Sequence, residues 1–251
     1  MQGTTPLLVL MPGLDGTGVL FERFVAELPS EIRTRIVNYR NDAAQSLEAH
    51  AAAASAILAN ESVVLLAESF SGLVALKLLG EHKVRVEKVI FIASFAKAPR
   101  RYLNVLTRLF PTLVRGIKFI PRALWRIFCL GTRASDADVA WLKSVLARAN
   151  PEVIAHRLKL VASARLVPCG RIGVPAFYLQ GIGDRLVPAR AARALGALFK
   201  EFTVLRIDGP HFLLQAAPRE CAETIAKLVL DAPDTVGRIG FDAACGDSRK
   251  N

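Results

Sequence analysis

Residues 63–73, VVLLAESFSGL, decide the fold of this 251-residue chain. The run Val63–Leu66 is fully apolar, which is typical of a strand buried on both faces of a parallel sheet. Small residues stand two positions before and two positions after Ser69, and a helical pattern of apolar residues begins at Leu73. The stretch therefore predicts a buried strand, a tight turn at Ser69 and a helix that follows it.

The same alternation of strand and helix continues on both sides of this stretch. Strands are predicted at Leu7–Met11, Arg33–Tyr39, Ser62–Ala67, Val86–Ala93, Val174–Gln180 and Phe202–Asp208. Helices are predicted at Val19–Leu28, Ala43–Asn60, Gly72–His82, Pro188–Phe199 and Pro218–Leu230. This alternation predicts an α/β protein with a mostly parallel sheet of about six strands and helices on both faces.

The alternation is interrupted between residues 97 and 171, where prolines separate helix-like pieces and no strand pattern occurs. We call residues 97–171 the cap segment and predict that it is an all-helical insertion. The core domain then comprises residues 1–96 and 172–232. The polar residues 233–251 are expected to form a flexible tail.

The net charge of +11 is concentrated in the cap segment. That segment holds fifteen Lys and Arg residues and three acidic ones, whereas the rest of the chain holds 18 basic and 19 acidic residues. Two interpretations remain open: a solvated helical face, or a basic amphipathic surface that contacts anionic lipid or an acidic partner protein. No nucleic-acid recognition module accompanies the charge, so nucleic acid is disfavoured.

The chain is expected to be cytoplasmic and not transmembrane. Its apolar runs are shorter than the roughly 18–20 residues of a membrane-spanning helix, and its N-terminus lacks the basic region of a secretory signal. The four cysteines, at positions 129, 169, 221 and 245, form no CxxC pair and no cluster with zinc-ligand spacing. We therefore expect reduced thiols and no metal site.

Three polar residues follow predicted strands at one edge of the sheet. Ser69 follows the third strand, Asp184 the fifth and His211 the sixth. Ligand sites in open α/β sheets lie at this edge, where parallel strands end. The three residue types are those of a nucleophile, its base and an orienting acid.

The order Ser, Asp, His along the chain resembles that of the α/β-hydrolase family, and the resemblance spans roughly residues 5–230. The resemblance rests on the loop Pro12–Gly18, the turn at Ser69, the GxxDxxVP motif at 181–188 and the Gly-Pro-His at 209–211. Ala67 and Ser71 replace both glycines of the usual G-x-S-x-G pattern, and the family's frequent His-Gly after the first strand lacks its histidine here.

The resemblance implies a serine esterase similar to the small soluble carboxylesterases, which need no cofactor. Ser69 would be the nucleophile, His211 the base and Asp184 the orienting acid. The backbone N–H groups of Leu14 and Phe70 would form the oxyanion hole, which stabilises the charge that develops on the substrate carbonyl. The expected substrate is a small acyl ester, cleaved through an acyl-enzyme intermediate.

The cap segment lies where this family covers its active site. Its apolar residues would line an acyl-binding cleft, with Leu103, Leu106, Phe110 and Trp125 as candidates. Its basic surface would dock an acidic acyl carrier protein, as the pimeloyl-acyl-carrier-protein methyl ester esterases of this family do, or an anionic lipid surface.

Several alternatives stay open at this point. The fold also suits a thioesterase or acyltransferase acting on carrier-bound acyl groups, or a non-catalytic acyl-ligand binding protein. Asp208 is a rival for the acid. The glycine-rich residues 13–18 resemble a dinucleotide-binding loop, but their spacing is GxxGxG and a Walker lysine is absent. His50, in a helix expected to be polar-faced, has a structural explanation, as do His82 and His156.

Overall fold

One parallel sheet forms the centre of the molecule. The computed structural model describes residues 6–41, 44–58, 61–81, 83–99, 116, 119–165 and 171–230. All neighbouring strands are parallel and follow the order β2-β1-β3-β4-β5-β6. Their bounds are β1 Leu7–Met11, β2 Thr34–Ile36, β3 Ser62–Glu68, β4 Arg85–Ile92, β5 Ala176–Gly181 and β6 Phe202–Ile207. The predicted α/β class and the six parallel strands are confirmed.

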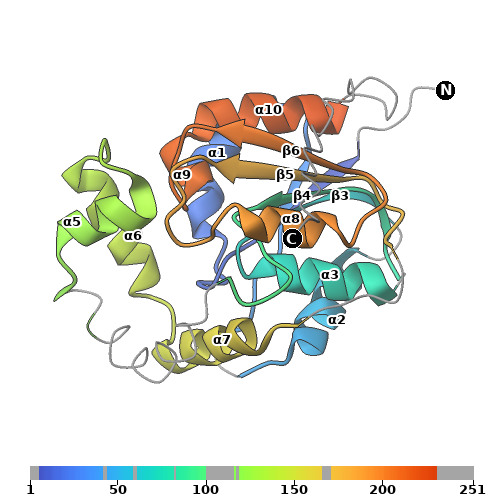
Figure 1. Cartoon of the computed structure of the whole chain (residues 1–251), viewed down its shortest axis with the longest axis horizontal. Helices are drawn as coiled ribbons and strands as arrows, with labels where there is room; N and C mark the ends of the chain where they lie inside the picture. Colours follow the sequence, from blue (N-terminus) through green and yellow to red (C-terminus); the bar gives the residue numbers. More distant parts are fainter. Residues whose placement is uncertain are drawn as a thin grey trace, which may run out of the picture.

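Helices cover both faces of the sheet, as Figure 1 shows. One face carries η1 (Val19–Phe21), α1 (Glu22–Ala26), α9 (Leu213–Ala216) and α10 (Pro218–Leu230). The other face carries α2 (Leu47–Leu58), α3 (Ser71–Glu81) and α8 (Arg190–Gly196). Successive residues of β1 point alternately to the two faces, so Leu7, Val9 and Met11 join one apolar core and Leu8 and Leu10 join the other.

The sheet has a switch point between β1 and β3. From β1 the chain leads outward to β2 at the edge, and then crosses back to β3 on the other side of β1. Loops that leave neighbouring strands in opposite directions open a crevice at the C-terminal ends of those strands. The loop after β1 and the turn at Ser69 lie at this crevice.

Several predicted elements are shorter than expected. The predicted strand at 33–39 keeps only Thr34–Ile36, since Tyr39 donates its backbone N–H to Gly16 in the loop after β1 (2.8 Å) instead of continuing the strand. The predicted helix at 19–28 is divided into η1 and α1 and ends at Ala26. Pro29 disfavours helical geometry at the residue before it, which explains this early end. Helix α9 was not predicted.

The described part of the cap segment contains helices and no strand. They are α5 (Arg122–Trp125), the π-helical η3 (Arg126–Leu130), α6 (Asp136–Leu146) and α7 (Pro151–Ser163). Figure 1 shows α5 and α6 beyond the C-terminal ends of β5 and β6. Lys97 and Arg165 form an isolated antiparallel bridge near the two ends of the segment. The domain boundaries stay a prediction.

Some sequence predictions fall outside the described residues. These are Leu103, Leu106 and Phe110 of the expected cleft, and the tail at 233–251. Within the described ranges, no helix combines the length and the apolar character needed to cross a membrane. The cytoplasmic location stays a prediction.

Candidate active site

Ser69 occupies a strained turn between β3 and α3. Its φ of +50° lies in the left-handed region, which non-glycine residues rarely adopt. The Ser69 N–H donates to the Ile92 carbonyl (2.8 Å), and the Ser69 carbonyl accepts from the Gly72 N–H (3.0 Å). A Cβ at Gly72 would lie 2.6 Å from the Ser94 Cβ, so glycine is required there. Such strain persists only when neighbouring contacts enforce it, and it points to a functional role for Ser69.

His211 brings Asp184 and Ser69 into one chain of contacts. The His211 Nε2 atom lies 3.4 Å from the Ser69 Oγ, and its Nδ1 atom lies 3.0 Å from an oxygen of Asp184. The His211 and Asp184 side chains are both buried. A proton held on Nδ1 by Asp184 leaves Nε2 free to accept the serine proton. The structure therefore brings together the three residues predicted from the sequence.

The Asp184 carboxylate is fixed by its own loop. Its second oxygen accepts the backbone N–H groups of Leu186 and Val187, at 2.8 and 2.9 Å. Asp184 thus also braces the loop before α8. The rival acid Asp208 is exposed, and Asp184 is the acid in contact with His211.

The loops after β5 and β6 approach one another very closely. A Cβ at Gly181 would lie 2.6 Å from the Pro210 carbonyl oxygen and 2.7 Å from that of Gly209. The Gly183 N–H also donates to the Gly209 carbonyl (2.9 Å). This close approach sets Asp184 and His211 at hydrogen-bonding distance.

The two predicted oxyanion donors come from two different loops, Phe70 from the turn at Ser69 and Leu14 from the loop after β1. Phe70 directly follows Ser69 and is buried, and Leu14 lines the same cavity as Ser69. In the described part of the chain, neither backbone N–H donates to another protein group. Two unused donors near the half-buried Ser69 suit an oxyanion hole.

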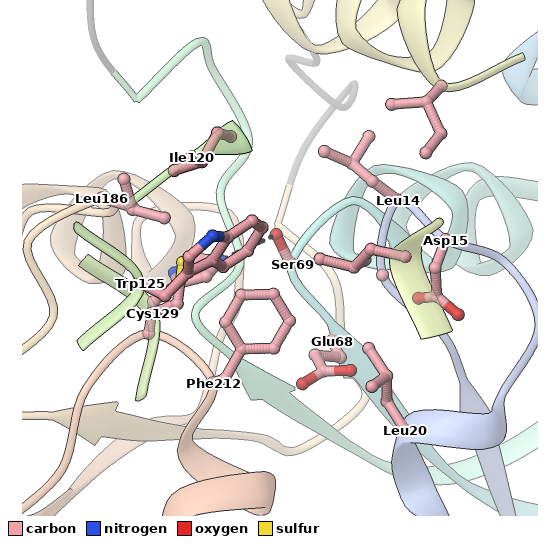
Figure 2. A pocket seen from close by; sticks show the side chains of 14 residues that line it. Leu14, Asp15, Leu20, Glu68, Ser69, Ile120, Trp125, Cys129, Leu186 and Phe212 are labelled. Atoms are coloured by element: carbon pink, nitrogen blue, oxygen red, sulfur yellow. Dashed lines mark hydrogen bonds between the residues drawn. The ribbon is translucent and has the colours of Figure 1, made fainter. Parts of the chain in front are cut away.

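A mostly apolar cavity of about 270 Å³ opens onto Ser69 and His211. Its apolar wall comes from the core and from the cap segment, as Figure 2 shows, with Leu14, Leu20, Phe212, Ile120, Trp125 and Cys129 among the lining residues. Trp125, one of the candidates for the acyl-binding cleft, lies in the wall of this cavity. Within the described residues, no group of three or more His, Cys, Asp or Glu side chains could hold a metal ion.

Comparisons with known proteins identify the family of this chain. The alpha/beta hydrolase family model matches residues 8–224. This chain belongs to the alpha/beta hydrolase family. Pimeloyl-[acyl-carrier protein] methyl ester esterase from Vibrio atlanticus is 30% identical, with 78% of this chain and 83% of the relative covered. The same-named protein of Vibrio cholerae is 29% identical, with 76% and 81% covered.

Solved structures of low identity share the alpha/beta hydrolase fold. An esterase from Exiguobacterium antarcticum has a TM-score of 0.72 at 17% identity and covers 91% of this chain and 93% of its own. A thermophilic esterase from Thermogutta terrifontis has a TM-score of 0.73 at 20% identity, with 90% of both chains covered. These likenesses show the fold.

This family member also carries two buried acidic residues at the cavity that the sequence analysis missed. Glu68 and Asp15 are both buried and line the cavity. Burial, reinforced by the charge of Asp15, raises the Glu68 pKa to about 7, although the Gln215 side chain opposes this by donating to Glu68 (3.2 Å). The sequence signal for Glu68 was its position, because it directly precedes the predicted nucleophile Ser69.

The environment of His50 corrects one expectation. His50 is buried and not on a polar face: its ring centroid lies 4.6 Å from that of Tyr39 and 5.5 Å from that of Phe70. Burial lowers its pKa to about 4, so it is neutral near pH 7. Ser71 is buried next to this cluster, with its hydroxyl 2.6 Å from the Tyr39 hydroxyl. It is therefore a structural residue rather than a nucleophile.

Proposed function

We propose that this protein, a carboxylic ester hydrolase, cleaves acyl esters through an acyl-enzyme intermediate with Ser69, His211 and Asp184 as its catalytic triad. The single observation that carries the proposal is the chain of contacts Asp184–His211–Ser69 on a strained strand-to-helix turn. Family membership and the esterase relatives support it.

The reaction proceeds in two halves. The Ser69 Oγ attacks the ester carbonyl while His211 Nε2 takes the hydroxyl proton, and Asp184 stabilises the resulting imidazolium. The N–H groups of Leu14 and Phe70 bind the oxyanion. His211 then protonates the departing alcohol, and the acyl group stays on Ser69. In the second half His211 activates a water molecule, which releases the acid and restores the serine.

The cavity sets the class of acyl group. The surface of its wall is mostly apolar, so burial of an aliphatic acyl chain there is favourable, by roughly 25 cal/mol per Å² of apolar surface buried. A volume of about 270 Å³ lies near the lower end of the ligand-pocket range. We therefore propose a preference for short or medium acyl chains.

The cap segment, residues 97–171, is proposed to cover this site and to meet the carrier of the substrate. Its excess of basic residues complements an acidic protein. Two curated relatives are named for an acyl-carrier-protein ester. We favour an acyl carrier protein as the partner. An anionic lipid surface is the alternative, and the dependence of activity on salt distinguishes the two.

A fluorophosphonate probe tests the catalytic assignment. Fluorophosphonates phosphonylate an activated serine, so the probe should label the wild-type protein at Ser69 and leave Ser69→Ala and His211→Ala unlabelled. Labelling of a different residue, or equal labelling of all three proteins, would refute the triad.

A further inference from the structure

Among the residues that the structure describes, Arg157 is the largest fully buried side chain, yet it carries a charge. It extends from α7 of the cap segment and forms no salt bridge with a described residue. Its Nε atom also has no acceptor among them. The charge of Asp15 partly offsets the cost of burying the guanidinium, but a buried charge without a direct ion pair still costs free energy that an apolar side chain would avoid. Packing alone therefore does not explain an arginine at this position.

The guanidinium joins the cap segment to two loops of the core. Its Nη1 donates to the Leu14 carbonyl (2.7 Å) and its Nη2 to the Arg40 carbonyl (2.8 Å). Its Cζ lies 5.5 Å from the Tyr39 ring centroid. Arg157 thus holds the loop after β1 against the segment after β2.

The loop after β1 is shaped to receive this side chain. Gly16 has a φ of +73°, and a Cβ there would lie 2.4 Å from the Arg157 Nη1. Ile154, three residues before Arg157 on α7, and Leu158 belong to an apolar cluster against which Leu14 packs. Leu14 is therefore held both through its side chain and through its carbonyl.

The contacts bracket one particular peptide group. The Leu14 N–H belongs to the peptide between Gly13 and Leu14. The carbonyl before this peptide, that of Pro12, accepts a hydrogen bond from the Ser71 hydroxyl. The carbonyl after it, that of Leu14, accepts from Arg157. Both flanks of the proposed oxyanion donor are anchored, one by the helix that follows the nucleophile and one by the cap segment.

We propose that Arg157 is a positioning residue for ester hydrolysis: it fixes the orientation of the Leu14 N–H toward the oxyanion. This rests on the proposed function, because the oxyanion forms only if Ser69 attacks an ester. Removing an oxyanion donor slows other hydrolases by a factor of about 10² to 10³. A donor that is displaced rather than removed should cost less.

The decisive experiment compares Arg157→Lys and Arg157→Met with wild type. A lysine keeps the charge but reaches at most one of the two carbonyls well, whereas methionine removes both bonds. We expect kcat to fall about 10-fold to 100-fold in Arg157→Met and less in Arg157→Lys. KM should change by less than about threefold.

The affinity for an alkylboronic acid distinguishes a positioning role of Arg157 from a merely structural one. It forms a tetrahedral adduct with the activated serine and mimics the oxyanion, so its Ki should rise by the same factor as kcat/KM falls. Binding of the product acid should stay nearly constant. Lys159→Met, the matched control, removes a charge from an exposed position of the same helix. It should leave kcat, KM and the Ki of the boronic acid unchanged.

Folding is checked by circular dichroism and thermal unfolding. Unchanged kcat and boronate affinity in folded variants would overturn the proposal, as would equal losses of boronate and product binding. Failure of both variants to fold would overturn it too, since Arg157 would then be structural. A separate outcome, a wild-type protein whose Ser69 resists fluorophosphonate, would instead refute the proposed function.

Discussion

The backbone N–H of Phe212 donates a 3.0 Å hydrogen bond to the carbonyl oxygen of Cys129. This bond ties the loop that carries His211 to η3 of the cap segment. Both residues also line the cavity over Ser69, where Figure 2 shows Cys129 and Phe212 on the same side as Trp125. The cap segment therefore contacts both loops of the proposed machinery, the His211 loop through η3 and the oxyanion loop through α7.

Replacing Asp184 with Asn should disable the triad without disturbing the fold. The amide oxygen can still accept from the Leu186 and Val187 N–H groups, but the amide NH₂ would donate to Nδ1 and force the proton onto Nε2. That tautomer cannot accept the serine proton, so kcat should fall by about 10³ to 10⁴. Asp208→Asn, the matched control at the exposed rival acid, should keep full activity. A large loss in the control with little loss at Asp184 would reverse the assignment.

Glu68→Gln should change how stability depends on pH. Because the folded-state pKa of Glu68 is raised from 4.5 to about 7, the unfolded chain ionises first as pH rises. The contribution of Glu68 to the free energy of unfolding is therefore fully present below pH 4.5 and is lost as pH rises through 7. The loss amounts to at most about 3 kcal/mol. In urea unfolding, the free energy of unfolding of Glu68→Gln relative to wild type should be higher at pH 8 than at pH 4.5, by part of this amount.

The comparison of wild type with Glu68→Gln also removes the opposing effect of His50. Its pKa is lowered to about 4 in the folded state, so its contribution is present above pH 6.5 and lost as pH falls through 4. This background is common to both proteins and cancels in the difference. A stability difference that stays constant from pH 4.5 to pH 8 would contradict the account of Glu68.

Two glycines should respond oppositely to alanine. At Gly181 the new Cβ meets the backbone oxygens of Pro210 and Gly209, which cannot rotate away, so the His211 loop must move. Esterase activity should fall, and stability should decrease by roughly 1–3 kcal/mol. At Gly80, exposed in α3, a Cβ meets nothing within 4 Å, and alanine should stabilise by roughly 0.5–1 kcal/mol. An active, unperturbed Gly181→Ala would contradict the described loop packing.

Ionic strength tests the basic surface of the cap segment. If an acidic carrier protein docks there, hydrolysis of a carrier-bound ester should fall steeply between about 0.05 and 0.5 M salt. Hydrolysis of a small neutral ester should not change. Arg133→Glu in the cap should weaken only the carrier reaction, whereas Lys200→Glu, outside the cap, should not. If hydrolysis of an ester in anionic vesicles depends on salt while hydrolysis of the carrier-bound ester does not, the lipid surface is favoured over the carrier protein.

The sequence was informative wherever chain order alone determines position. Parallel strands end at one edge of the sheet, so Ser69, Asp184 and His211 could be assigned to a common site before their distances were known. Burial of individual polar residues was not predictable in this way. Arg157 resembles the other basic residues of its segment, and only the tertiary contacts of α7 distinguish it. The buried Glu68, Asp15 and His50 depend likewise on contacts distant in sequence.

The most direct test of the central claim is hydrolysis of p-nitrophenyl esters from acetate to palmitate, with wild type beside Ser69→Ala. The account predicts turnover by wild type, highest for short or medium chains, and a loss of at least about 10³-fold in a folded Ser69→Ala. A folded Ser69→Ala that hydrolyses these esters as fast as wild type would contradict it.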